Sequence, residues 1–354
     1  MRGVRTLFIR QRIAARGASL VEAMVGALVA LITVLVILAT LATAEGRKRN
    51  AVGAADAQQT GLVTLESLGR EIANAGSGLA SSARELDTCP DTGDIRTSLR
   101  PLPVLVTAGA NASAPDTLVV NHGAATGHGA SVPFAADASA GFPYRVKSPF
   151  GLAANDMMVA MSLGGACALT TATTVSAVDA DGVVDVAHAG APENYPATSR
   201  LLNLGPRGRA VRVRYDVSGD ALRSLDLYTA GAAPNPLASG IVNFKVQYGI
   251  DSDGDGALDT WAGGDVAPWT PAALLPAPAA TLARIKALRL GLIVRSETFD
   301  RDVAGPFNWV LFDCAAMDKT LCAGRITGTL PAGWRYRVHE ATVLLRNAIW
   351  NSPP

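Results

Sequence analysis

The sequence predicts an α+β protein in which a long N-terminal helix, transmembrane in its first half, packs on an antiparallel β-sheet head with large loop-rich insertions. Three observations lead to this prediction. An uncharged apolar run lies near the N-terminus, an amphipathic helical pattern follows it, and strands of alternating hydrophobicity fill the C-terminal part of the 354-residue chain. A composition of 49% hydrophobic and 17% charged residues excludes a disordered or coiled-coil chain.

The apolar run covers residues 23–44 and contains no formal charge. A helix of about 20 apolar residues crosses the hydrocarbon core of a bilayer, so we expect residues 18–45 to form a transmembrane half-helix. More basic residues precede the run than follow it, which predicts a cytoplasmic N-terminus and a head on the far side. The preceding residues are Arg2, Arg5, Arg10, Arg12 and Arg16, and the following ones are Arg47, Lys48 and Arg49.

The helix is expected to continue through residues 46–76 as an amphipathic half. Leu65, Leu68, Ile72 and Ala75 recur at helical spacing with charged residues between them, which is typical of a helix that lays one face on a core. The Gly-Ser-Gly sequence at 76–78 ends the pattern.

The head divides into two parts of different character. Residues 77–205 are rich in Ala, Gly, Ser, Thr and Pro, with short β-like runs at 117–121, 157–162 and 183–186, and predict a loop-rich β insertion region. Residues 206–354 contain clearer strands at 211–216, 242–248, 288–294 and 336–346, the second being the cleanest half-buried strand. Strands without helices between them predict an antiparallel sheet.

The four cysteines are Cys89, Cys167, Cys314 and Cys322. They have no Cys-x-x-Cys spacing and no histidine beside them, which argues against a zinc site. In an exported head an even number favours two disulfides. Because the segment between Cys314 and Cys322 is short, we expect these two to pair, and Cys89–Cys167 follows by elimination. Buried free thiols are the alternative.

An Asp-rich segment follows the strand at 242–248. It has carboxylates at positions 1, 3, 5 and 9 of a calcium loop, a glycine at position 6 and a backbone carbonyl at position 7. These residues are Asp251, Asp253, Asp255, Asp259, Gly256 and Ala257. Position 12 is Ala262 instead of glutamate, so a full site needs direct binding by Asp259, or Asp265, a distant acid or water. The sequence therefore suggests calcium as a cofactor, with an Asp/Gly-rich hairpin turn as the alternative.

The N-terminus resembles the leader of type IV prepilins. The basic leader ends in Gly17, Ala18 follows, and the apolar run carries a single acid, Glu22, near its start. The resemblance implies that a prepilin peptidase removes residues 1–17 by cutting between Gly17 and Ala18, and that the new amino group is methylated. It departs from the family at Ala18, where phenylalanine is frequent.

Glu22 is the residue to which the resemblance assigns assembly. A carboxylate within a membrane segment is costly, so it usually has a partner or a function. The resemblance implies that Glu22 pairs with the N-terminal amine of a neighbouring subunit. The alternative is that Glu22 lies at headgroup level, where an acid also suits the start of a helix.

Three C-terminal segments narrow the resemblance to the PilW family of minor pilins: residues 242–256 (VNFKVQYGIDSDGDG), 285–296 (IKALRLGLIVRS) and 336–347 (YRVHEATVLLRN). It implies a pilin-like fold and a non-catalytic minor pilin that helps to initiate, prime or cap a type IV pilus within a tip complex, with roles in cell adhesion and twitching motility. Expected partners are other minor pilins, the major pilin, a tip adhesin and the prepilin peptidase. The chain would lie in the inner membrane with a periplasmic head, and in the pilus tip or fibre after assembly.

Two other functions share these features. One is a pseudopilin of a type II secretion system, and the other is a membrane-anchored periplasmic binding module or adhesin. No catalytic fingerprint such as a P-loop or G-x-S-x-G is present in the sequence, which argues against an enzyme. Without the leader's arginines the 31 basic residues fall to 26 against 30 acidic ones, so no nucleic-acid partner is expected.

Overall fold

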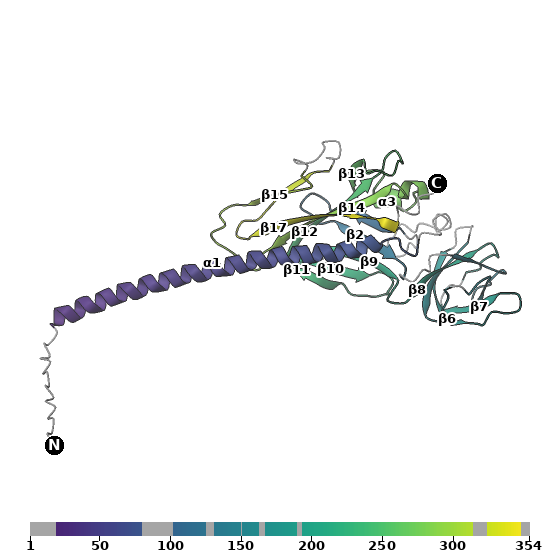
Figure 1. Cartoon of the computed structure of the whole chain (residues 1–354), viewed down its shortest axis with the longest axis horizontal. Helices are drawn as coiled ribbons and strands as arrows, with labels where there is room; N and C mark the ends of the chain where they lie inside the picture. Colours follow the sequence, from purple (N-terminus) through teal and green to yellow (C-terminus); the bar gives the residue numbers. More distant parts are fainter. Residues whose placement is uncertain are drawn as a thin grey trace, which may run out of the picture. The chain divides into compact units, whose positions relative to one another are not determined.

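The computed structural model describes residues 19–79, 102–124, 131–149, 151–162, 167–189, 193–313 and 324–347. The chain forms two compact units that divide between Val52 and Gly53, within the 55-residue helix α1 (Leu20–Asn74). The described elements run from α1 into β-strands with two short helices among them (Figure 1), which confirms the predicted α+β fold class.

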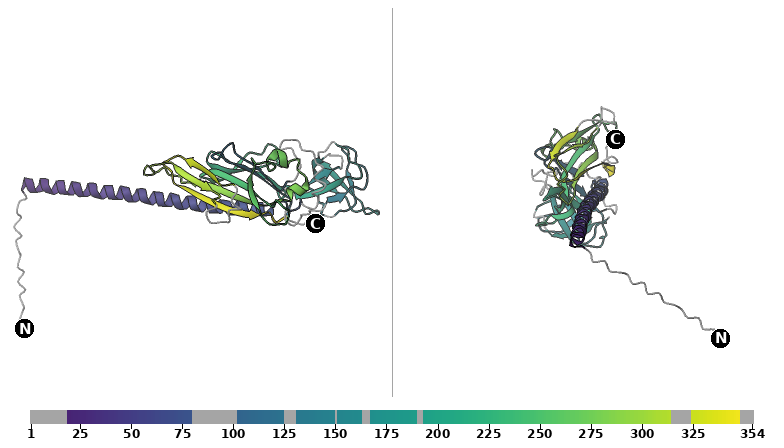
Figure 2. Two further views of the ribbon diagram at one scale, coloured as in Figure 1. Left: turned by 90° about the horizontal axis from the view of Figure 1, so that it is seen from above. Right: turned by 90° about the vertical axis from the view of Figure 1, so that its left-hand side faces the viewer.

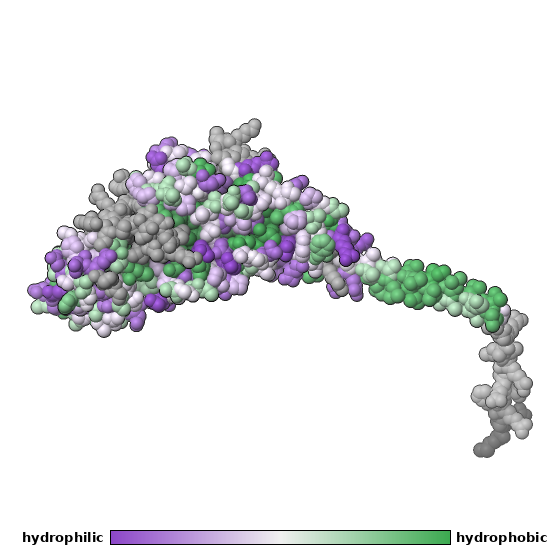
Figure 3. All heavy atoms as spheres, turned by 180° about the vertical axis from the view of Figure 1, so that it is seen from behind, coloured by the Kyte–Doolittle hydropathy of each residue, from purple (hydrophilic) through white to green (hydrophobic). Residues whose placement is uncertain are grey.

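The first unit consists, where it is described, of the N-terminal half of α1. Its large apolar side chains from Leu20 to Leu41 are all more than half exposed, and Figure 3 shows this half as a continuous hydrophobic surface. Among the described residues, α1 is the one helix that is long and apolar enough to cross a membrane. The predicted apolar half-helix is therefore present.

In the second unit, α1 buries one face. Leu65, Leu68, Ile72 and Ala75 are 6% exposed or less and join the main core, so the predicted apolar stripe is confirmed. The helix ends at Asn74, and Gly76 and Gly78 follow with positive φ angles of 79° and 71°, a backbone conformation that glycine adopts without strain.

Two antiparallel sheets share this core with α1. The five-stranded sheet has the order β1-β2-β9-β10-β11, and the four-stranded sheet has the order β13-β12-β14-β17. The first contains β1 (Val104–Thr107), β2 (Thr117–His122), β9 (Val211–Ser218), β10 (Ala221–Asp226) and β11 (Asn235–Ser239). The second contains β12 (Ile241–Ile250), β13 (Thr260–Gly263), β14 (Ile285–Arg295) and β17 (Tyr336–Leu344).

Three smaller features complete this part of the head. Strands β15 (Phe307–Leu311) and β16 (Ile326–Leu330) pair as a separate two-stranded sheet. The short helices α3 (Pro271–Leu274) and α4 (Ala279–Leu282) precede β14.

The strands predicted at 211–216, 242–248, 288–294 and 336–346 correspond to β9, β12, β14 and β17, and their pairing is antiparallel as expected.

A six-stranded β-barrel lies within the region predicted to be a loop-rich insertion. Its strand order is β3-β8-β5-β6-β7-β4, and Figure 2 shows these strands in teal at one end of the head. The strands are β3 (Ser131–Pro133), β4 (Tyr144–Val146), β5 (Asp156–Met161), β6 (Cys167–Val175), β7 (Val184–Ala189) and β8 (Arg200–Pro206). Hydrogen bonds from Lys147 N to Pro133 O (3.0 Å) and from Ala135 N to Arg145 O (2.7 Å) join the two outer strands and close the sheet.

The barrel has its own apolar core, which includes Phe134, Tyr144, Met158 and Tyr195. It is inserted between two neighbouring strands of the five-stranded sheet, because β2 and β9 pair directly with His122 opposite Val211. The chain thus leaves the sheet after β2, builds the barrel, and returns to the adjacent position.

Strand β12 differs from the expectation of a half-buried strand. Asn243, Lys245 and Gln247, predicted to face solvent, are 4% exposed or less. The reason is tertiary: the segment before β2 covers this face, and Lys245 Nζ donates to Asp116 Oδ1 (2.8 Å) and to the Ala114 carbonyl (2.6 Å). A buried ammonium is tolerated when a carboxylate and further acceptors surround it.

Candidate functional site

Glu22 lies in the first turn of α1, and its side chain is exposed. An acid at this position is stabilised by the partial positive charge of the helix N-terminus. The described helix continues from Glu22 through the apolar run without another charged residue before Glu45. Pairing of Glu22 with a neighbouring subunit remains a prediction, and the predicted cleavage residues Gly17 and Ala18 lie outside the described residues.

The Asp-rich loop brings three of its predicted calcium ligands together. One carboxylate oxygen each from Asp251, Asp253 and Asp259 lie within 4.8 Å of one another. Asp255 stands apart from this group, and its Oδ1 accepts a hydrogen bond from Ala257 N (2.7 Å). The donor set of carboxylate oxygens suits a hard cation such as calcium.

Asp251 anchors this loop and is 1% exposed. Its two oxygens accept hydrogen bonds from Gly254 N (2.6 Å) and Gly256 N (2.9 Å), and Lys286 Nζ lies 3.5 Å from Oδ2. Burial alone would raise the pKa of Asp251, but these two hydrogen bonds and Lys286 outweigh it and leave the pKa lowered. The loop therefore holds an ionised carboxylate at the first ligand position.

Asp259 is a second carboxylate of the loop that hydrogen bonds hold in place. Its Oδ2 accepts hydrogen bonds from both the hydroxyl and the backbone amide of Ser252, each 2.6 Å long. These bonds lower the pKa of Asp259. Calcium binding by the loop stays a prediction, as does the backbone carbonyl of Ala257 as a ligand.

Of the four cysteines, only Cys167 belongs to the described residues, and it is disulfide-bonded. Cys89, Cys314 and Cys322 lie outside them, so the pairings Cys314–Cys322 and Cys89–Cys167 stay predictions. The segment that carries Cys314 and Cys322 connects β15 to β16, whose facing residues Leu311 and Ile326 are paired. The ends of that segment are thus adjacent, as a small closed loop requires.

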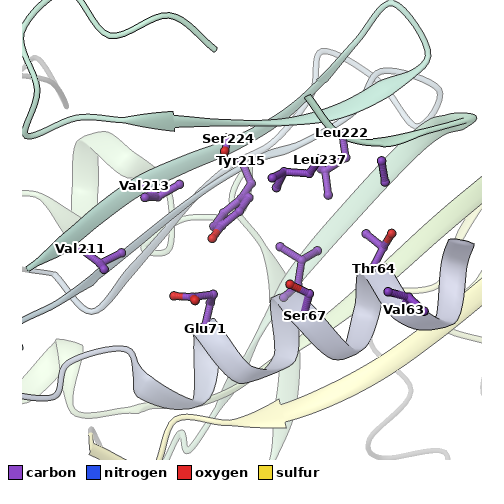
Figure 4. A pocket seen from close by; sticks show the side chains of 12 residues that line it. Val63, Thr64, Ser67, Glu71, Val211, Val213, Tyr215, Leu222, Ser224 and Leu237 are labelled. Carbon is purple, nitrogen blue, oxygen red and sulfur yellow. The ribbon is translucent and has the colours of Figure 1, made fainter. Parts of the chain in front are cut away.

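A groove with a volume of about 380 Å³ lies in the second unit between α1 and strands β9, β10 and β11 (Figure 4). Its lining is mostly apolar. The carboxylate of Glu71 and the hydroxyl of Tyr215 lie toward one another at one end. Burial, followed by the nearby charge of Glu71, raises the pKa of Tyr215, so its hydroxyl stays neutral.

Glu71 is linked to the sheet through His122. His122 Nε2 lies 3.3 Å from Glu71 Oε2, and His122 Nδ1 lies 2.9 Å from the Gly123 carbonyl oxygen. His122 is the last residue of β2, and its side chain is only 12% exposed. The separation of 51 positions between Glu71 and His122 explains why periodicity could not reveal the contact.

Comparison with known proteins agrees with the sequence resemblance. Residues 213–347 match the family model of the type IV pilus-assembly protein W, a range that contains the three C-terminal segments and the Asp-rich loop. No curated protein matches the chain. Among solved structures, a type IV-like pilin from Thermus thermophilus is similar, with 19% identity over 40% of this chain and 70% of that chain and a TM-score of 0.23. The family match over this part of the chain supports a pilus-related role.

Proposed function

We propose that this chain is a minor pilin that helps to initiate, prime or cap assembly of a type IV pilus as part of a tip complex. The observation that carries the proposal is the match of residues 213–347 to a pilus-assembly family, in a chain whose N-terminal helix is apolar and exposed before it enters the head. The partners would be other minor pilins, the major pilin and a tip adhesin.

In this proposal, the apolar half of α1 first holds the chain in the inner membrane. A helix of about 20 apolar residues is stable there because its backbone is satisfied internally. On assembly the same side chains would exchange lipid for the helices of neighbouring subunits. Van der Waals packing between the helices would then stabilise the bundle.

Glu22 would set the register of that bundle. A carboxylate at the start of an apolar helix gains most when a cation lies close to it, since an unpaired charge in a low-dielectric environment is costly. The cation proposed here is the amino terminus of an adjacent mature subunit, which peptidase cleavage before Ala18 would create.

The decisive experiment compares pili from cells that carry either the wild-type chain, Glu22→Ala or Glu66→Ala. Glu66 is an exposed acid on the same helix, paired with Arg70, and serves as the matched control. We expect all three chains to be processed and inserted into the membrane, and only Glu22→Ala to be missing from sheared pili. Normal incorporation of the Glu22→Ala chain into pili would contradict the proposed role of this residue.

A second measurement tests the maturation step independently. The intact mass and N-terminal sequence of the chain are determined from cells with and without the prepilin peptidase. The proposal expects a start at Ala18 and an added methyl group only where the peptidase is present. An uncut chain, or one cut after the apolar run, would favour an ordinary anchored binding module instead.

We also propose that the Asp-rich loop binds calcium and braces the head. Asp251, Asp253 and Asp259 would supply carboxylate oxygens, and a bound cation would relieve their mutual repulsion. The loop lies between β12 and β13, two neighbouring strands of the four-stranded sheet, so that binding would stiffen the connection between them.

A further inference from the structure

The groove beside α1 has the dimensions of a short polypeptide segment. Its helical wall extends from Val63 to Glu71, which is about 12 Å along the axis at 1.5 Å per residue. An extended chain advances by about 3.3 Å per residue, so a segment of about four residues spans this length. The opposite wall comes from β9, β10 and β11, and no residue of the first unit lines the groove.

Large apolar side chains flank the end of the groove distant from Glu71. Val63 on α1 is 59% exposed, and Leu237 on β11 is 48% exposed. Deeper in the groove, Leu68 and Leu222 are buried at 2% and 0% exposure. Apolar side chains inserted between these walls would remove both rim residues from water, which is the main source of binding free energy at such surfaces.

The other end of the groove carries one negative charge. Glu71 is the single acid among the lining residues, and there is no Lys, Arg or His among them. Its Oε2 faces His122, whereas the described residues offer its Oε1 no hydrogen-bond partner, and the side chain is 41% exposed. The hydrogen bond with His122 and the charge of His122 outweigh burial and lower the pKa of Glu71, so the carboxylate is ionised at neutral pH. A cation is the complementary group for such an oxygen.

We propose that this groove binds a segment of a neighbouring polypeptide that carries apolar side chains followed by one lysine or arginine, with the apolar residues between Val63 and Leu237 and the cation on Glu71. The surface is distinct from Glu22 and from the Asp-rich loop. A lipid surface is disfavoured, because anionic headgroups would meet the carboxylate of Glu71. The inference requires a neighbouring protein but no pilus, so it stands or falls separately from the proposed function.

The test places a photo-crosslinking amino acid at position 63 in the full-length chain expressed in its own cells. After irradiation, the crosslinked peptide is identified by mass spectrometry. The expected product is a peptide with apolar residues at the crosslink and a Lys or Arg close to them. The same crosslinker at Val178, which is 51% exposed on the barrel, should not give this product.

Two substitutions test the chemistry, each with a matched control. Glu71→Gln keeps the shape and removes the charge, and we expect the crosslink yield to fall by about fivefold, the equivalent of a half-exposed ion pair. Leu237→Arg should lower the yield by about tenfold or more, because it removes an apolar rim contact and places a positive charge where the bound segment carries its own cation. Glu66→Gln and Val178→Arg, at exposed positions outside the groove, should leave the yield unchanged.

Three results would overturn the proposal. They are a crosslinked peptide without a basic residue, a product formed only with lipid, and a yield that is the same in Glu71→Gln and wild type. Thermal unfolding of each variant separates a folding defect from a binding defect, since Glu71→Gln also alters the contact with His122. If Glu71→Gln unfolds early, the comparison is made with Leu237→Arg, whose side chain is on the rim. If wild-type crosslinks appear but the chain is absent from pili, the groove proposal holds and the proposed pilus role fails.

Discussion

Gly61 of α1 lies directly against His339 of β17, so that a Cβ atom on Gly61 would overlap the imidazole ring of His339. The ring is 5% exposed and packs directly on the helix backbone. Only a residue without a side chain permits this approach, so Gly61 determines how closely α1 lies on the four-stranded sheet.

We therefore expect Gly61→Ala to destabilise the head by about 1–3 kcal/mol, the usual cost of overpacking. Gly69→Ala is the matched control on the same helix, because its Cβ would lie 3.6 Å from Val343 Cγ2, an ordinary contact. In a helix interior that change should stabilise by about 0.5–1 kcal/mol. Urea unfolding of the full chain in detergent, followed by tryptophan fluorescence, measures both. Equal midpoints for the two variants would contradict the packing argument.

The same histidine makes stability depend on pH. Burial lowers the pKa of His339, and the charge of Arg337 adds to this, against a hydrogen bond with the Ala57 backbone. Its folded pKa thus lies below the ordinary value of 6.5, so the unfolded chain binds the proton first. The contribution of the neutral His339 ring to the free energy of unfolding is fully present above pH 6.5. It is lost as the pH falls toward the folded pKa. The slope of unfolding free energy between pH 7 and pH 5 should flatten in His339→Gln. An unchanged slope would show that His339 titrates normally.

His122 should act in the opposite sense. Burial would lower its pKa, but the hydrogen bonds to Glu71 and to the Gly123 carbonyl, together with the charge of Glu71, leave the pKa raised above 6.5. The stabilisation is therefore complete below the unfolded pKa and is lost as pH rises through the folded pKa. Because the pKa of Glu71 is lowered from 4.5, the pair is strongest between about pH 5 and pH 6. His122→Gln should cost most in that window and least at pH 8, as NMR titration of the ring and unfolding at each pH can show.

The Lys245–Asp116 pair is a fourth test of the fold. Both side chains are 5% exposed or less, and Asp116 Oδ2 also accepts from Val246 N (2.9 Å). Asp116→Ala leaves a buried ammonium without its counter-ion and should cost about 3–5 kcal/mol. Replacing both residues, by Lys245→Met with Asp116→Leu, should cost less than Asp116→Ala alone. Arg70→Gln, which removes an exposed pair with Glu66, should change stability by at most about 1 kcal/mol. A cost for Asp116→Ala as small as that of Arg70→Gln would contradict the buried pair.

Calcium addition tests the Asp-rich loop directly. At a calcium concentration 100 times the dissociation constant, the free energy of unfolding should rise by about 2.7 kcal/mol. Asp253→Asn should abolish the increase, whereas Asp181→Asn, at an exposed aspartate of the barrel, should retain it. Isothermal titration with calcium and with magnesium supplies the affinity and the selectivity. No heat and no stabilisation would mean that the loop is a hairpin turn held by Asp251.

Local sequence patterns predicted two kinds of element. In the first, the contacting residues lie close in sequence, and in the second, the apolar residues repeat with one period over a long segment. The stripe of Leu65, Leu68 and Ile72 and the alternation along β12 and β14 each predict the right element. Sequence patterns do not predict the barrel, because β3 and β4 have three residues each. These strands acquire their conformation from strands that lie far away in sequence.

The candidate site divides in the same way. Glu22 and the aspartates of the 251–259 loop are visible in the sequence, since their spacing alone points to a role. The groove and the pairing of Glu71 with His122 arise only when α1 meets β2 and β9. The burial of Lys245 likewise depends on a segment more than 100 residues earlier, so a strand that alternates polar and apolar residues becomes covered on both faces.

The direct pairing of His122 with Val211 has an evolutionary consequence. Because the barrel departs from and returns to adjacent positions of one sheet, a gene segment for residues 123–210 could be gained, lost or exchanged as a cassette while β2 and β9 keep their register. Selection on the barrel and selection on the helix-bearing core can then proceed at different rates. Related chains should accordingly vary in length between these two strands and agree in the strands that follow.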